Sequence, residues 1–109
     1  MPFDESLADR IRESLARRRG ITDRKMFGGV GFLLNGNMLV GVWKDSLIVR
    51  LDPGEYEDAL AEEHVRVFDI TGRPMRGWVM VDAVGLDEDA DLKAWIDRAW
   101  TYVKTLPAK

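Results

Sequence analysis

Two apolar segments, residues 30–34 and 38–43, lie on either side of the dipeptide Asn35-Gly36. Asn-Gly supplies the two positive-φ residues of a tight type I′ turn, so the segments are predicted to pair as an antiparallel hairpin. A second turn at Lys44-Asp45 leads into the apolar segment 46–51. The chain is therefore predicted to contain a three-stranded antiparallel meander.

Alternation along these strands predicts which side chains share a face, because successive residues of a strand point to opposite sides. In the middle strand, Met38, Val40 and Val42 are expected to lie together on one face. The first strand is expected to begin near Lys25, where helical spacing gives way to alternation.

Helices are predicted before, between and after the strands. The first spans residues 4–19, with apolar residues at helical spacing and Gly20 as a left-handed C-terminal cap. The second, residues 52–63, begins with Asp52-Pro53, a capping residue followed by proline at the first helical position. The third runs from residue 87 or 89 to residue 105, is the most periodic element in the chain and carries a broad apolar stripe.

Two more apolar segments, at 65–70 and 77–84, are typical of strands joined by a loop. The predicted fold class is α+β, a two-layer α/β sandwich with helices on one face of an antiparallel five-stranded sheet. The predicted order is α-β-β-β-α-β-β-α. At 109 residues the chain is expected to form a single domain, residues 1–109.

The composition excludes several classes of function. The absence of cysteine excludes disulfide scaffolds, thiolate zinc sites and cysteine nucleophiles. The first residues lack the apolar run of a signal peptide, and no apolar stretch approaches the roughly 20 residues of a membrane helix. A soluble, cytoplasmic protein without a membrane partner is therefore expected. The net charge of −3 argues against a strongly basic nucleic-acid binder.

Basic residues are nevertheless concentrated near the start of this acidic chain. Five of them form a candidate contact set for nucleic acid or for an acidic protein partner: Arg17, Arg18, Arg19, Arg24 and Lys25. The alternative is a solvated helix end whose arginines stabilise the C-terminal dipole. The sequence leaves both interpretations open.

The glycine-rich segment KMFGGVG, residues 25–31, has neither the P-loop pattern nor the dinucleotide-binding pattern. A strand follows it, so no helix N-terminus is available for an anion. Its motif residues are expected to be structural: Met26, Phe27, Gly28, Gly29 and Gly31. The three glycines are expected to mark either a bulge or a face where a helix backbone approaches the sheet closely. The alternatives are phosphate contact through Arg24 and Lys25, or a small-ligand pocket beside Met26 and Phe27.

No catalytic, cofactor-binding or metal-binding residue is predicted. His64 is the only histidine in the sequence, and no nucleophile can be paired with it from motif patterns. The acidic run at 87–91 has the spacing of the start of a calcium loop, but Leu92 stands where that loop needs glycine and Arg98 where it needs glutamate. The four tryptophans are expected mainly in the core, although one on an outer face would suggest an interface, as in a homodimer.

Five segments carry a family resemblance: RKMFGGVGF, NGNML, DSLIVRLD, GRPMRGWVMVD and DLKAWIDRAWTYVKTLP. Together they span nearly the whole chain from about Ile21 onward, and the MFGG element is the most specific of them. In these segments the chain resembles the N-terminal domain of the TfoX/Sxy family, the competence regulators.

The resemblance implies a two-layer α/β fold and a link to the transcriptional regulation of DNA-uptake genes. Full-length members carry a second, C-terminal domain, whereas this chain ends at Lys109. The family offers no established catalytic residues to carry over. The leading hypothesis is a non-enzymatic regulatory or protein-interaction module with a protein partner. The alternatives are direct nucleic-acid binding through residues 17–25, and a ligand-binding or enzymatic pocket near MFGG.

Overall fold

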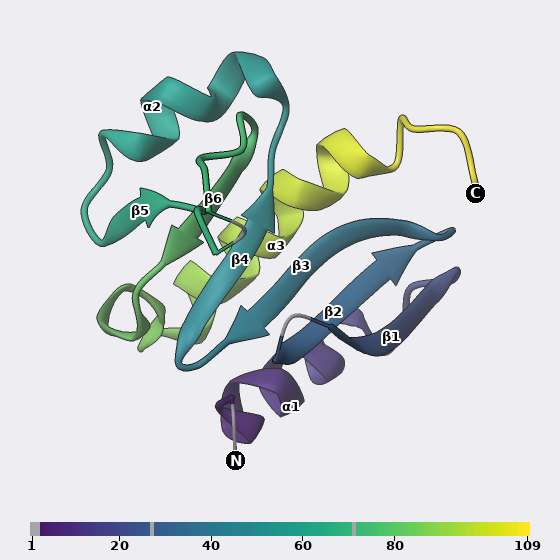
Figure 1. Ribbon diagram of the computed structural model, residues 1–109. Helices are drawn as coiled ribbons and strands as arrows, with labels where there is room; N and C mark the ends of the chain where they lie inside the picture. Colours follow the sequence, from purple (N-terminus) through teal and green to yellow (C-terminus); the bar gives the residue numbers. More distant parts are fainter. Residues whose placement is uncertain (1–2, 27, 71) are drawn as a thin grey trace.

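The computed structural model describes residues 3–26, 28–70 and 72–109 (Figure 1). Its helices and strands are α1 (Glu5–Leu15), β1 (Ile21–Met26), β2 (Gly29–Leu34), β3 (Asn37–Trp43), β4 (Ser46–Arg50), α2 (Tyr56–Leu60), β5 (Val65–Val67), β6 (Trp78–Val81) and α3 (Asp89–Val103). Short 3₁₀ helices, Pro53–Glu55 and Ala83–Leu86, precede α2 and α3.

The main hydrophobic core lies between the sheet and the helices. Leu7 and Ile11 of α1 and Trp95 and Ile96 of α3 enter this core together with apolar residues of the strands. Figure 1 shows α1 and α3 against the same face of the sheet, while α2 lies at the end formed by β5 and β6. The α+β architecture expected from the sequence, with three helices and an antiparallel sheet, is confirmed.

The sheet has six strands, in the order β1-β2-β3-β4-β6-β5, so the expected number of five is wrong. The additional strand is β1 at one edge, which pairs antiparallel with β2 from Ile21 opposite Leu34 to Met26 opposite Gly29. The four central residues of β1, at 22–25, are polar and exposed. Because an edge strand can remain largely solvated, β1 needs no apolar alternation, and none marks it in the sequence.

The turns of the meander form as expected. Asn35 and Gly36 have φ of 51° and 86°, as the type I′ turn requires, and Lys44 has φ of 55° at the next turn. Asp52 caps the segment before α2, since its carboxylate accepts a hydrogen bond from the N–H of Gly54 at 2.8 Å. Local turn and cap chemistry is therefore a reliable guide to this part of the chain.

A β-bulge changes which side chains share a face in β3. Phe32 lies opposite Val40, and the next pair joins Leu33 to Met38, so Leu39 is an extra residue on the β3 side. Leu39 and Val40 both enter the core against the helices, whereas Met38 packs on the opposite, helix-free face. The expectation that Met38 lies on the same face as the core valines of β3 is therefore wrong.

The first two helices are shorter than expected. α1 ends at Leu15 and α2 spans only Tyr56–Leu60, while α3 ends at Val103, close to its expected end. Gly20 adopts a left-handed φ of 82°, but it lies in the loop before β1 and does not cap α1. Its carbonyl accepts a hydrogen bond from the Asn35 N–H at 2.8 Å. This contact ties the loop to the β2–β3 hairpin instead of extending the helix.

Candidate functional site at the junction of α1 and β1

The candidate contact residues lie where α1 ends and β1 forms an edge of the sheet. We call this region, residues 12–26, the α1–β1 corner (Figure 1). It comprises the last turn of α1, the loop at 16–20 and the whole of β1. The corner thus combines a helix end, a connecting loop and a strand that has a neighbour on one side.

Arg18 is anchored to α3. Its Nη2 donates to Oδ1 of Asp97 at 2.6 Å, and its guanidinium carbon lies 4.6 Å from the ring centroid of Trp100. Only 23% of the side chain is exposed. An ion pair and a cation–π contact on the same guanidinium restrict its movement. Arg18 therefore holds the loop against α3 and is not free to bind a partner.

The same contact affects the acid that receives it. Partial burial by itself would raise the pKa of Asp97, but hydrogen bonds from Arg18 and Lys93, together with their positive charges, outweigh burial and hold the pKa below its ordinary value of 3.8. Lys93 donates to the second carboxylate oxygen at 3.0 Å. Asp97 is therefore charged at neutral pH and keeps the anchor in place.

The other four candidate cations are exposed. Arg17 and Arg19 lie in the loop on either side of the anchor, and Arg24 and Lys25 lie on β1. Within the part of the chain that the structure describes, none of the four makes a side-chain hydrogen bond or an ion pair. Four positive charges of the corner are therefore available to an anionic partner.

β1 divides its two cations between the faces of the sheet. Lys25 lies opposite Val30 and shares the helix-covered face, whereas Arg24 lies opposite Gly31 on the helix-free face. A partner lying flat on one face would meet one of these cations. A partner that approaches the edge of β1 can contact both.

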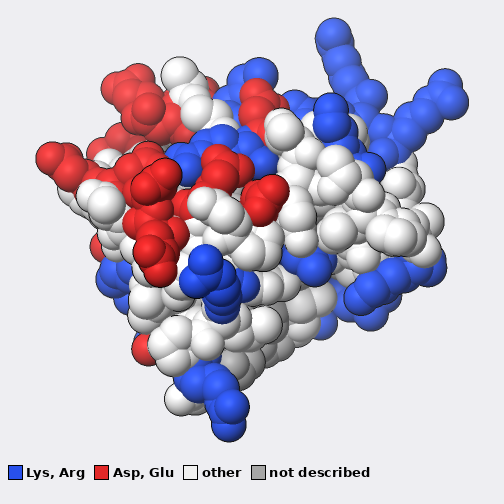
Figure 2. Space-filling view, turned by 90° about the horizontal axis from the view of Figure 1, so that it is seen from above, with Lys and Arg blue, Asp and Glu red and all other residues white. Residues whose placement is uncertain are grey.

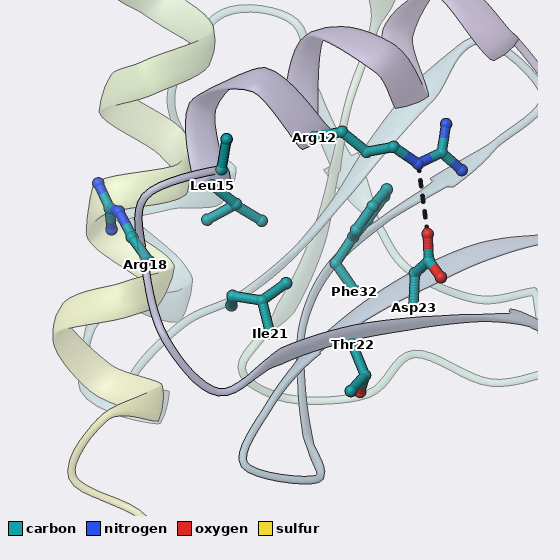
Figure 3. A pocket seen from close by; sticks show the side chains of 8 residues that line it. Arg12, Leu15, Arg18, Ile21, Thr22, Asp23 and Phe32 are labelled. Atoms are coloured by element: carbon teal, nitrogen blue, oxygen red, sulfur yellow. Dashed lines mark hydrogen bonds and ion pairs between the residues drawn. The ribbon is translucent and has the colours of Figure 1, made fainter.

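A cavity of about 290 Å³ separates α1 from β1 in the corner. Figure 3 shows the side chains of Leu15, Ile21 and Phe32 converging on this space from α1, β1 and β2. We call this cavity the α1–β1 slot. It could not be predicted from the sequence, because Ile21 belongs to the polar edge strand that the apolar pattern does not mark.

An ion pair spans one end of the slot. Nε of Arg12 donates to Oδ2 of Asp23 at 3.3 Å (Figure 3), and Nη1 of Arg12 donates to Oδ1 of Asp9 at 2.8 Å. The Arg12 guanidinium carbon also lies 5.6 Å from the ring centroid of Phe32. These contacts link β1 to α1 and leave the middle of the slot to apolar side chains.

The glycines of the MFGG segment have structural roles. Gly28 has a φ of 79° in the turn between β1 and β2, a conformation that favours glycine. A Cβ on Gly29 would collide with the backbone carbonyl oxygen of Val42 in β3, and a Cβ on Gly31 would lie 2.8 Å from Sδ of Met38. The close approach at Gly29 and Gly31 therefore comes from a strand and a methionine, so of the two alternatives from the sequence, a bulge or a helix backbone, the helix backbone does not apply.

The space over Gly31 is filled, because Met26 and Met38 both reach it. A ligand pocket on this side of the MFGG segment, one of the alternatives from the sequence, would need these methionines to move. Phe27, the remaining residue of the motif, lies outside the described residues.

The described residues form neither a metal-binding cluster nor a membrane-spanning helix. No group of three or more His, Cys, Asp or Glu side chains there could hold a metal ion. His64 is exposed, with a φ of 67°, and its Nε2 lies 3.8 Å from a carboxylate oxygen of Glu63. None of the helices in the described part is both long and apolar enough to cross a membrane.

A family model described as the TfoX N-terminal domain matches residues 13–102. The chain belongs to the TfoX N-terminal domain family. The matched residues include the whole of β1 and the contact of Arg18 with Asp97 and Trp100, so most of the corner belongs to the family domain. No curated protein and no solved structure matches the chain significantly.

Charge is unevenly distributed over this TfoX N-terminal domain. Figure 2 views the molecule from above and shows acidic side chains gathered on the side of α2, with basic side chains projecting from the opposite side. Five acids lie in or beside α2: Glu55, Glu57, Asp58, Glu62 and Glu63. α2 packs beside β5 and β6, at the opposite end of the sheet from β1, so Arg24 and Lys25 are separated from these acids.

Proposed function

We propose that this TfoX N-terminal domain is a regulatory module that acts by binding another macromolecule and does not catalyse a reaction. The contact surface is the α1–β1 corner, and the partner is an acidic protein surface. Family membership supports a competence-regulator-like role. The proposal therefore includes cytoplasmic regulation of DNA-uptake genes through a protein partner.

One observation carries the proposal: four exposed cations project from a corner whose loop is fixed by Arg18. Because the anchor to Asp97 and Trp100 already orders the loop, less conformational entropy is lost when a partner binds. Unpaired cations also accelerate the encounter with an acidic partner and select against a basic one. The corner thus has a loop that is ordered before binding and a positive charge that favours an acidic partner.

The double substitution R17E/R19E tests this proposal. Its matched control is R73E/K104E, which makes the same change of net charge at exposed cations outside the corner. Cross-linking and affinity capture in cells producing each form should recover the same protein with the wild type and the control. Recovery should be lost with R17E/R19E. Equal recovery with both double variants would contradict a binding role for the corner.

Direct nucleic-acid binding is a second candidate, favoured by the same unpaired cations. Each phosphate contact contributes about −0.9 to the slope of log K against log salt concentration. A labelled DNA duplex should then bind with an affinity that falls steeply with salt, and R24E/K25E should flatten that slope. An absence of binding even at low salt would remove this candidate and leave the protein partner.

The proposal also includes a homodimer formed through the helix-free face of the sheet. On this face the half-buried side chains of Met38, Trp43 and Trp78 surround the buried Ile48 and Met80. Antiparallel sheets that face water on one side usually carry polar residues there. A concentration of methionine and tryptophan instead is typical of a protein interface.

A further inference from the structure

The free edge of β1 is the first of three features of the corner that suit a peptide. Ile21–Met26 pairs with β2 on one side, and within the described residues no strand or loop makes backbone hydrogen bonds to its other side. Alternate N–H and C=O groups of an edge strand point outward, where an extended segment can pair with them. Residues 22–25 are exposed, so this edge is accessible to a partner.

The α1–β1 slot is the second feature, and it lies beside the same edge. Leu15, Ile21 and Phe32 line it (Figure 3), and its volume of about 290 Å³ is at the lower limit of small-molecule pockets. Such a space suits an apolar side chain better than a cofactor. Because side chains alternate along a strand, a segment paired with β1 would direct every second side chain toward the helix-covered face, where the slot lies.

Charge is the third feature. The positive charge of Arg12 at the slot is already matched by Asp9 and Asp23. The cations of β1, Arg24 and Lys25, are unmatched and lie on opposite faces of the strand. An extended acidic segment can place carboxylates on both faces at once, whereas a basic segment would be repelled.

We infer that the corner binds an extended acidic segment of a partner protein, which is the form taken by the binding proposed above. The segment pairs with β1 as a further strand, inserts one apolar side chain into the slot, and places acidic side chains beside Arg24 and Lys25. A DNA duplex supplies phosphates for these cations, but it has no peptide backbone for β1 and no apolar side chain for the slot. The three features together therefore favour a peptide over a nucleic acid.

The first test is selection from a random display library of peptides of about ten residues against the folded chain. The expected consensus is a single Leu, Ile, Val or Phe with Asp or Glu within two positions on either side. Enrichment of basic peptides would overturn the inference, and so would a selection without a consensus.

Titration of a labelled peptide carrying that consensus then tests the slot. Ala16 lines the slot, so A16W fills it and should weaken binding by at least about tenfold, the loss expected when a large apolar side chain stays in water. The matched control is A61W, because Ala61 is likewise an exposed C-cap residue, but at α2. Far-UV circular dichroism verifies that both variants fold. Equal affinities of the two variants would overturn the assignment of the slot.

Backbone pairing is tested with two versions of the same peptide, N-methylated at alternate amides. A segment paired with a strand edge uses every second amide for that strand, and its other amides point away. One version should therefore bind at least about tenfold more weakly, while the other keeps nearly the original affinity. If the two versions bind alike, the segment does not add to β1 and the inference fails.

The inference and the proposed function can fail separately. Loss of partner capture with R17E/R19E, combined with no acidic consensus from the library, would retain the corner as a binding surface and remove the extended segment. Peptide binding that responds to A16W, combined with equal capture by R17E/R19E and R73E/K104E, would retain the peptide site and remove the proposed partner-binding role of the loop cations.

Discussion

Arg18 illustrates how neighbouring residues of one type take different roles at the residue scale. Three arginines follow one another at 17–19, and the middle one pairs with Asp97 and stacks on Trp100. Its two neighbours are exposed. Packing of the loop against α3 determines which of the three side chains faces α3 and which face solvent. The basic run therefore consists of one structural residue between two that are free to bind.

Asp97→Asn should lower the free energy of unfolding at pH 7 by roughly 0.5–1 kcal/mol, because Arg18 and Lys93 lose their charged partner. The effect stays small because 42% of the Asp97 side chain is exposed and solvent screens the pair. Since the folded-state pKa lies below 3.8, the contribution is complete above that pH and is lost as the pH falls through the folded-state pKa.

Urea unfolding at pH 7 and at about pH 2.5, followed by tryptophan fluorescence, measures this difference. Asp91→Asn is the control, because Asp91 is an exposed acid of the same helix. It should change the unfolding free energy by less than about 0.5 kcal/mol. An Asp97→Asn effect of the same size at both pH values would show that the ion pair is not its cause.

The sequence identifies the basic residues of the corner but not their contacts. The partner of Arg18 lies 79 residues further along the chain, and no local pattern connects the two. The slot cannot be predicted from the sequence either. Leu15, Ile21 and Phe32 belong to three different elements, which only the tertiary fold brings together. The candidate residues could thus be predicted as a set, and their division into anchor and free cations could not.

At the scale of elements, regular apolar alternation and turn chemistry were sufficient for part of the sheet. The hairpin around Asn35-Gly36 is confirmed by the pairing of β2 with β3 and by the positive φ of both residues. Asn-Gly strongly favours this turn because both residues tolerate a positive φ. The sequence does not indicate β1, because its residues at 22–25 are polar and exposed, and it does not indicate the bulge, because Leu39 and Val40 are both apolar. The apolar pattern of a sequence cannot show which of two adjacent apolar residues is the extra residue of a bulge.

The two glycines of β2 should differ in their tolerance of substitution. Gly29→Ala should destabilise the domain by about 2–3 kcal/mol, because a Cβ there meets the Val42 carbonyl oxygen and the β3 backbone must shift. Gly31→Ala should cost less than about 1 kcal/mol, because the atoms it meets are the flexible ends of Met26 and Met38. Thermal and urea unfolding of both variants measures this order, and equal losses would contradict it.

At the scale of the whole molecule, the sheet carries an apolar cluster on each face, and helices cover one of the two faces (Figure 1). On the helix-free face Ile48 and Met80 are fully buried, and Phe68 packs over them with Met75 beside it. Side chains such as Trp43 remain half-buried at the margin of this cover. A second molecule that packs against the same face would remove the remaining apolar surface from water, which is the main driving force for association.

The domain should therefore form a homodimer, with a light-scattering mass near twice the 12.4 kDa of one chain. Met38→Glu places a charge among the apolar side chains of the helix-free face and should shift the mass toward that of a single chain. Val84→Glu is the control, because this side chain lies on the 3₁₀ helix before α3 and the residue is 59% exposed, so the mass should not change. Circular dichroism verifies that both variants fold. A wild-type mass of 12.4 kDa at high concentration would contradict the dimer, and the segment around Phe68 and Met75 would then be the whole cover of this face.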